Sequence, residues 1–284
     1  MEFQKKTTRY SFICWCLLLL MSCNEKTPTT KALVQIDNQP PISRLPQDAV
    51  GETVRKCIEN FGGWDAWAAK KTVAYTKISQ SYDSTGKLLK ERVELHQYQL
   101  NPQFRARISW QDSSNNYVLI NNGQQAWKFK NGVEMTAEND RKQAYNSTFG
   151  SHYVLCMPFK LTDPRTVLTD EGLVTLANGK ALKCIKTTYL KGAGSAGGMH
   201  TWWYLFDPKS SNLTANFLNS GDSFSFTDYV EFMVVDGIKL SKVRKGYAMN
   251  AKRDVRHLTS IYTNKDFVFD KPLADSLFEP LKNN

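Results

Sequence analysis

Side chains suited to metal chemistry are few in this chain and lie far apart in the sequence. The four histidines are widely separated from one another, and no Cys-x-x-Cys motif occurs. A zinc site needs ligands that are closely spaced or that converge through long-range folding. We therefore predict no metal site and no cofactor. The four histidines are His96, His152, His200 and His257.

The acidic residues offer no recognisable catalytic pair. Folding could bring together Asp163, Asp170, Glu171 and Asp228, but their spacing singles none of them out for general acid–base work. We predict that the protein is not an enzyme. A histidine and a carboxylate converging in a cleft would argue against this prediction.

The glycine-rich loop 192–198 is the segment most similar to a catalytic motif. Ala193-Gly194-Ser195-Ala196-Gly197 is one residue away from the Gly-x-Ser-x-Gly nucleophile elbow. A nucleophile elbow and a phosphate-binding loop are both followed by a helix. The residues after this loop, Met199 to Phe206, read as a strand, so we interpret the loop as part of a hairpin.

The N-terminus carries the most specific motif. Basic residues precede the apolar run Phe12–Met21, which leads into Leu20-Met21-Ser22-Cys23. A spanning helix needs about 20 apolar residues, so this shorter run is typical of a cleaved signal peptide. Its ending resembles the acylation site of bacterial lipoproteins. The resemblance predicts a signal peptide over 1–22 and lipidation of Cys23; the alternative is a plain signal peptide with a chance cysteine.

The composition favours membrane lipids over nucleic acid as partners. Removing residues 1–22 would lower the formal net charge from +10 to +8, because the segment holds three basic residues and one acidic residue. A basic exported protein is attracted to anionic head groups, although the same charge also serves solubility. We expect a protein anchored in the bacterial cell envelope, on the outer membrane and facing the periplasm.

Three cysteines remain after Cys23, an odd number for a disulfide framework in an oxidising compartment. One disulfide with one free thiol is possible in principle. The alternative is three buried thiols that behave as small apolar side chains. The residues are Cys57, Cys156 and Cys184.

The remaining chain reads as a linker, two short helices and many strands. Residues 23–45 are polar and contain prolines, which is typical of a linker. Apolar spacing predicts a helix over 47–61 and a further helical turn over 64–69. From residue 72 on we predict nine to eleven strands, with a partly helical segment over 137–156. Three hairpin turns, Asn122-Gly123, Asn178-Gly179 and Asp236-Gly237, indicate antiparallel pairing. Residues 46–284 are expected to form one α+β domain that is mainly antiparallel β.

Aromatic side chains on these strands suggest a ligand cavity, since acyl chains need large and mostly apolar cavities. The alternative for each of them is ordinary core packing. Basic residues on two strands are candidates for an anionic head group, or else lie at a solvated edge. The cavity candidates are Phe104, Ile108, Trp110, Trp127, Phe129, Trp203 and Phe206, and the head-group candidates are Arg105, Arg107, Lys242 and Arg244.

Several short motifs, taken together and in this order, resemble the Lol lipoprotein carriers and their superfamily. Asn101-Pro102-Gln103-Phe104-Arg105 resembles the Pro-x-x-Phe-Arg strand of these carriers, and Asn122 to Phe129 resembles the hairpin that follows it. The segments 204–208, 235–240 and 273–280 resemble three later strands and turns. This chain departs from the pattern by its length, by Asn122 in place of an acidic residue and by the loop 192–198, which indicates a branch other than the dedicated lipoprotein receptors.

The resemblance implies a strongly curved half-barrel sheet whose concave face is covered by N-terminal and inserted helices. It also implies that the protein binds or carries a lipid or a lipoprotein acyl chain in that concavity. The alternative is an envelope sensor or scaffold that uses the same fold to bind a protein partner. A concavity filled by the protein's own side chains would favour the alternative.

Overall fold

The computed structural model describes residues 41–190, 194, 198–221 and 223–281. Its main element is one antiparallel sheet of 13 strands, two more than the upper limit expected from the sequence. The strands are β1 (Thr72–Tyr82), β2 (Leu88–Gln99), β3 (Arg105–Asp112), β4 (Asn115–Asn121), β5 (Ala126–Lys130), β6 (Val133–Glu134), β7 (Thr166–Thr175), β8 (Ala181–Tyr189), β9 (Thr201–Phe206), β10 (Leu213–Asn219), β11 (Phe224–Val235), β12 (Ile238–Met249) and β13 (Val255–Phe269).

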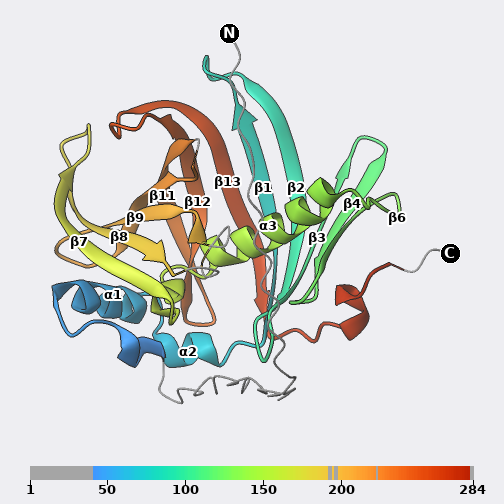
Figure 1. Ribbon diagram of the computed structural model, residues 1–284, viewed down its shortest axis with the longest axis horizontal. Helices are drawn as coiled ribbons and strands as arrows, with labels where there is room; N and C mark the ends of the chain where they lie inside the picture. Colours follow the sequence, from blue (N-terminus) through green and yellow to red (C-terminus); the bar gives the residue numbers. More distant parts are fainter. Residues whose placement is uncertain (1–40, 191–193, 195–197, 222, 282–284) are drawn as a thin grey trace, which may run out of the picture. The chain divides into compact units, whose positions relative to one another are not determined.

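The sheet is built from two runs of neighbouring strands joined at its centre. Its order is β6-β5-β4-β3-β2-β1-β13-β12-β11-β10-β9-β8-β7, so the first strand pairs with the last. All other neighbours are consecutive in the sequence, as the hairpin turns predict. Figure 1 shows the sheet curling around the helices as an open half-barrel. The predicted mainly antiparallel α+β half-barrel is therefore confirmed.

The turn between β11 and β12 illustrates why these strands pair. Asp236 and Gly237 both have positive φ, at 47° and 79°, as a two-residue hairpin turn of the I′ type requires. Val235 and Ile238 on either side of the turn are partners in the ladder. At the centre of the sheet, β13 runs unbroken over Val255–Phe269.

Helix α1 (Ala49–Asn60) carries the predicted apolar stripe, with Val54, Cys57 and Ile58 fully buried. Asp48 caps its N-terminus by accepting hydrogen bonds from the backbone N–H groups of Val50 and Gly51 at 2.9 and 3.0 Å. Helix α2 (Trp64–Ala68) follows it directly. Before α1, the 3₁₀ helix η1 (Pro41–Arg44) and the buried Leu45 belong to the described fold, although the sequence placed them in the linker.

The end of α1 is fixed to the β11–β12 hairpin by close backbone contact. The N–H of Lys239 donates to the carbonyl of Phe61 at 3.0 Å. Gly62 has φ +112°, and a Cβ there would lie 2.4 Å from the carbonyl oxygen of Gly237. Only glycine fits this position, because any side chain would meet both a strained backbone and the neighbouring turn.

Helix α3 (Glu138–Leu155) connects β6 with β7 and so crosses the concave face from one edge of the sheet to the other (Figure 1). It is one continuous helix of 18 residues, where the sequence indicated a mixed segment. Its first half lies over β3, β4 and β5. At its other end Tyr153 contacts Tyr189 of β8 and Trp202 of β9.

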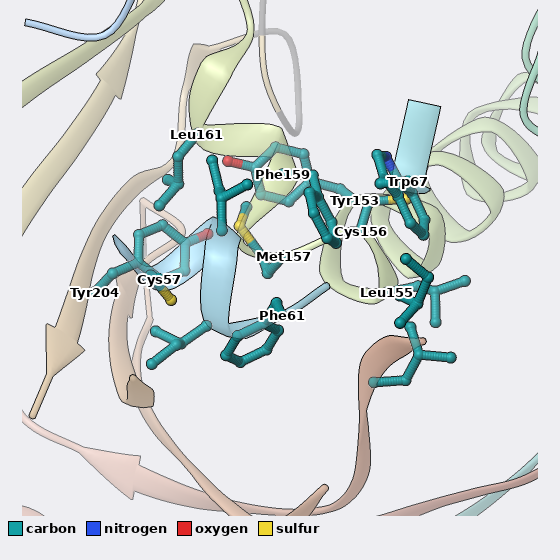
Figure 2. Packing of buried hydrophobic residues seen from close by; sticks show 14 of the residues in the cluster. Cys57, Phe61, Trp67, Tyr153, Leu155, Cys156, Met157, Phe159, Leu161 and Tyr204 are labelled. Atoms are coloured by element: carbon teal, nitrogen blue, oxygen red, sulfur yellow. The ribbon is translucent and has the colours of Figure 1, made fainter. Parts of the chain in front are cut away.

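The largest hydrophobic cluster fills the concave face on the side of α1 and α2. Figure 2 shows Cys57 of α1, Phe61 just after α1, Trp67 of α2 and Tyr204 of β9 packed with the segment that follows α3. In that segment Phe159 stacks on Trp67 with ring centroids 4.7 Å apart. This part of the concavity is therefore occupied by the protein's own side chains.

The three described cysteines, Cys57, Cys156 and Cys184, are all free and buried. This decides between the two alternatives left open by the sequence, in favour of three buried thiols. Burial raises the pKa of Cys57 and Cys156 to about 12 and that of Cys184 to about 11, so none of them is a nucleophile at neutral pH.

The opposite, convex face of β3 and β4 is covered by the C-terminal 3₁₀ helix η4 (Asp275–Phe278). Phe278 is fully buried. Among the described residues, no helix has the length and apolar character needed to cross a membrane.

Candidate functional site

An open cavity of about 460 Å³ lies on the concave face, between the first half of the sheet and α3. Its apolar wall consists of Ile108, Trp110, Tyr117 and Leu119 from β3 and β4. Trp110 stacks on Tyr117 with the ring centroids 5.1 Å apart. Gly150 and Ser151 of α3 line the opposite side. The remaining lining is charged or polar, so this cavity is not a dry acyl-chain tunnel.

The floor of the cavity carries a row of charged and aromatic side chains that crosses the centre of the sheet. Arg92 of β2 is paired with Ser79 of β1, Ser79 with Tyr262 of β13, and Tyr262 with Arg244 of β12. Side chains directly opposite one another in a ladder share a face. The two arginines therefore flank a common centre on the concave face.

Each arginine of this row lies over an aromatic ring. The Arg92 guanidinium carbon is 4.7 Å from the ring centroid of Trp110, and that of Arg244 is 5.3 Å from Tyr262. The Nε–H of both arginines is buried without a hydrogen-bond partner among the described residues. Buried donors of this kind are normally satisfied by a partner or by water. They are therefore candidates for binding an anion.

Glu94 is the acidic residue at the centre of the site. It lies on β2, two residues from Arg92 and therefore on the same face of the sheet. Its carboxylate lies 2.8 Å from Arg92 and 3.5 Å from the Nζ of Lys77, its ladder partner on β1. It also accepts from His96 Nε2 at 3.3 Å. Lys77 and Arg92 contact this one carboxylate, and Arg244 lies farther along the row across the sheet, which leaves the floor with an excess of positive charge.

The histidine behind Glu94 is held neutral. Desolvation lowers the pKa of His96 to about 4, against the opposing effect of the hydrogen bond to Glu94. A neutral ring donates from Nε2 to the carboxylate and accepts at Nδ1, where the hydroxyl of Tyr98 lies at 2.8 Å. The hydroxyl of Tyr75 lies 3.3 Å from the same nitrogen.

Glu94 is ionised at neutral pH. Burial by itself would raise the pKa of this carboxyl, but the hydrogen bond from His96 and the charges of Lys77 and Arg92 outweigh burial and lower the pKa to about 2. Desolvation also lowers the pKa of Lys77. The partners of Glu94 thus keep its carboxylate ionised among the cations of the floor.

A smaller cavity of about 250 Å³ lies beside the first along α3. Lys77, Gly150 and Ser151 line both cavities, while Arg244, Tyr262 and the apolar Trp202 and Val154 are found in this one. The two cavities therefore leave the charged floor open on either side of α3, and they meet beside Gly150.

The structure brings together four of the seven predicted cavity residues on the concave side. Ile108 and Trp110 line the larger cavity. Phe104 lies under α3, with its ring centroid 4.5 Å from that of His152. Phe206 is fully buried in the core cluster with α1, so it supports the fold and does not line the open space.

The other three candidates lie on the convex face. Trp127 and Phe129 alternate with Lys128, whose Nζ binds Asp140 of α3 at 2.8 Å on the concave side. Trp203 likewise alternates with Trp202 and Tyr204, which belong to the concave core cluster. Alternation along a strand therefore places all three away from the cavity.

The four predicted head-group residues also separate. Arg244 lies at the concave floor. Arg105 pairs with Asp275 and contacts the ring of Phe278, and Arg107 donates to the carbonyl of Leu277, so both hold η4 on the convex face. Lys242 forms an ion pair with Glu231 at 2.7 Å.

Sequence reasoning missed Lys77, Arg92 and Glu94, which form the centre of the site. Their signal was present in the sequence: Lys77 and Ser79 alternate with Thr76 and Ile78, and Arg92, Glu94 and His96 alternate with Val93 and Leu95. Such alternation normally marks the polar side as the solvent side. Here the polar side faces inward, toward α3.

Among the described residues, the candidate acid–base side chains do not converge in one open centre. His96, Glu94 and Tyr98 do make a carboxylate–histidine–hydroxyl chain, but His96 and Tyr98 are 0% exposed and only Glu94 reaches the cavity. Asp163, Asp170, Glu171 and Asp228 are not joined in one site. Among the described residues, no three His, Cys, Asp or Glu side chains lie close enough together to hold a metal ion. His152 and Cys156, one helical turn apart on α3 and its C-terminal end, therefore do not form a metal site. Ser195 lies outside the described residues.

Two solved structures have the same fold. A DUF1329 family protein from Desulfovibrio piger is 11% identical with a TM-score of 0.52, covering 82% of this chain and 98% of its own. A LolA superfamily protein from Nitrosomonas europaea is 9% identical with a TM-score of 0.51, covering 81% of this chain and 97% of its own. The sequence matches no family model and no curated protein. These likenesses establish a LolA-type fold, as the sequence motifs predicted.

Proposed function

We propose that this protein is an exported lipoprotein, anchored through Cys23 in the outer membrane, which binds an anionic amphiphile on the concave face of its half-barrel. In this proposal residues 1–22 are the signal peptide, the segment from the acylated Cys23 up to η1 is the tether, and the fold from η1 onward forms the binding domain. Binding involves no covalent chemistry.

The observation that carries the proposal is the combination of excess positive charge and an aromatic wall in one cavity. Lys77, Arg92 and Arg244 stand beside Glu94 on the floor of the two adjoining cavities, while Asp112 is paired with Lys90. Guanidinium groups bind carboxylates and phosphates strongly. Trp110 and Ile108 provide an apolar surface beside the charges. A lipid or an acylated peptide with an anionic head group offers both features.

The polar lining refines the ligand expected from the sequence. A cavity of about 460 Å³ that is largely charged suits a head group and the first part of a chain better than a whole acyl chain. At about 25 cal/mol per Å² of apolar surface removed from water, the Trp110 wall alone gives a modest contribution. Charge complementarity therefore supplies most of the selectivity.

An envelope scaffold that binds a protein partner is the second candidate. It is favoured by one observation: side chains of α1, α2 and the segment after α3 already fill the concavity beside the open cavity. A scaffold needs no ligand space, whereas a carrier of whole lipid molecules does.

The test uses residues 24–284 exported to the periplasm without the anchor, purified gently and extracted with organic solvent for mass spectrometry. We expect an anionic lipid or acyl peptide at near-stoichiometric amount, and its loss in Arg244→Gln. The matched control is Lys265→Gln, which removes an exposed basic residue from the same sheet. A ligand-free protein would contradict the carrier and favour the scaffold.

A further inference from the structure

A pocket larger than either concave cavity lies on the convex face of the sheet, away from the cationic floor. Its volume is about 840 Å³. Phe217 of β10, Phe226 of β11 and Tyr247 of β12 are successive ladder partners and form one aromatic row across its floor. Leu182 and Ala215 complete the floor, and both are 1% exposed. This second hydrophobic cluster is separate from the core under α1.

Two turns form the walls of this convex pocket. One is the β7–β8 turn, from Val174 to Lys180, and the other is the β12–β13 turn, from Lys252 to Val255. Arg253 fixes the second turn to the sheet, because its guanidinium carbon lies 4.5 Å from the ring centroid of Trp203 and its NH2 group is 3.2 Å from Glu171. Interactions within the chain thus define the shape of the pocket.

The charges that line the convex pocket nearly balance, with three cations against two carboxylates. Lys180 and Lys252 stand against Asp228 and Asp254, while Arg253 is paired with Glu171. A charged ligand would lose hydration on entering without meeting a net opposite charge, so the balance favours an uncharged ligand.

Asp228 is the polar group that would orient such a ligand. It lies on the floor beside Ala215, its ladder partner. Its carboxylate has no hydrogen bond or ion pair with any residue that the structure describes. Burial raises its pKa above the usual value for an aspartate, and the charges of Lys180 and Lys245 only partly oppose this rise. An ionised carboxylate only accepts hydrogen bonds, so the matching ligand group is a donor.

We propose that the convex pocket is a second binding site, which takes an uncharged amphiphile with an apolar chain and a hydroxyl group. The chain lies on the Phe217–Phe226–Tyr247 row, and the hydroxyl donates to Asp228. The volume falls within the range of small-molecule sites. This site is independent of the anionic ligand proposed for the concave face.

The experiment uses photoaffinity labelling of the full-length protein in its membrane with a decanol that carries a diazirine on its chain. We expect labelling of peptides from 174–182, 214–228 and 247–255, mapped by mass spectrometry. Free 1-decanol should compete at a concentration at least ten-fold lower than decyl methyl ether, which lacks the donor, or decanoate, which is charged.

Two variants locate the site. Val174→Trp enlarges a half-buried side chain in the wall and should abolish labelling of all three segments. Asp228→Val should remove the ten-fold preference for decanol over the ether while labelling persists. Circular dichroism melting checks that both variants fold, and Asp266→Asn, at an exposed position of β13, is the matched control that leaves labelling unchanged.

Labelling that survives Val174→Trp, or a preference that survives Asp228→Val, would overturn the proposal, as would labelling spread evenly over the chain. Labelling confined to residues of the concave cavity and lost in Arg244→Gln would also overturn it, while supporting the concave-face function. If the concave site held no lipid while the convex segments were labelled as expected, the convex-pocket proposal would be supported and the concave-face function would be contradicted.

Discussion

Glu94 and His96 show how a polar network can occupy the inner face of a curved sheet. The ionised carboxylate meets Lys77, Arg92 and His96 within 3.5 Å, and the histidine in turn meets two tyrosine hydroxyls. Removing one member of such a network leaves the others buried without a partner, which is costly. His96 and the two tyrosines are thus buried beneath the site, while Lys77, Glu94 and the arginines line its cavities.

We predict that acid destabilises the protein through His96. Its pKa is lowered from 6.5 to about 4, so the unfolded chain binds a proton at a pH where the folded protein does not. Stability is then lost as pH falls from 6.5 toward 4, by roughly 3 kcal/mol at 1.36 kcal/mol per pKa unit. Urea unfolding at pH 7.5, 6 and 5 measures this loss.

Two other groups, His152 and Glu94, also contribute to the loss of stability in acid. His152 is buried with its pKa also lowered by burial, so His96→Gln should reduce the pH dependence without abolishing it. Below pH 4.5 Glu94 adds a loss of the same sign, since its pKa is lowered to about 2. The exposed His257→Gln is the control; an equal effect in both variants would contradict the assignment.

A second prediction concerns the thiols. Because burial raises the pKa values of Cys57, Cys156 and Cys184 to between about 11 and about 12, residues 24–284 should show no fast reaction with a thiol reagent at pH 8. In denaturant the same protein should react with three equivalents, the number of cysteines after Cys23. Rapid reaction of the native protein would show that a cysteine is exposed.

At the scale of elements, α1 and α3 divide the concave face between packing and binding. Helix α1 presents Val54, Cys57 and Ile58 to the core and closes its side of the half-barrel. Helix α3 is only weakly amphipathic: its buried residues include Ala144 and Thr148 beside exposed Tyr145. Around Gly150 and Ser151 it leaves open space above the charged floor.

We predict that the junction of α1 with the β11–β12 hairpin is essential for stability. Gly62→Ala would place a Cβ 2.4 Å from the Gly237 carbonyl at φ +112°, so two backbone segments must move apart. We expect a loss of at least 2 kcal/mol, from strain at a special backbone position. Guanidinium unfolding measures the change.

Gly86→Ala is the matched control for this junction. Gly86 also has positive φ, +87°, but nothing lies within 4 Å of a Cβ there. Its loss should reflect backbone strain alone, about 1 kcal/mol. Equal losses in the two variants would show that the contact between α1 and the hairpin contributes little.

At the scale of the whole molecule, the fold separates two kinds of surface. The concave floor carries Lys77, Arg92 and Arg244, while the convex pocket has an aromatic row with nearly balanced charges. The pairing of β1 with β13 places the charged floor at the centre of the sheet, between its two runs of hairpins. One sheet can therefore present two chemically different sites.

Membrane attachment is a property of the whole chain, and we predict that it depends on Cys23. Cys23→Ser should abolish incorporation of radiolabelled palmitate and block signal cleavage, because acylation of the cysteine thiol comes before cleavage in the bacterial lipoprotein signals that this segment resembles. Ser22→Ala keeps a small residue before the cysteine and is the control. Palmitate incorporation in Cys23→Ser would contradict the assignment.

The sequence by itself determined most of the elements and their antiparallel pairing, because these follow from local physics. Turn residues such as Asp236-Gly237 require backbone angles that only hairpins use, and the apolar spacing of Val54 and Ile58 is that of a helix. The short motifs from Asn101 to Phe129 also pointed to the correct fold. Tertiary structure was not needed for any of these inferences.

Only the tertiary structure decided which face of each strand is concave. Alternation reveals two faces but not their direction of curvature, so Trp127, Phe129 and Trp203 were assigned to a cavity that they do not line. For the same reason Lys77 and Glu94 read as solvent-facing residues. Their inward placement depends on the β1–β13 pairing and on α3 crossing the sheet, contacts between residues far apart in the chain that no local pattern encodes.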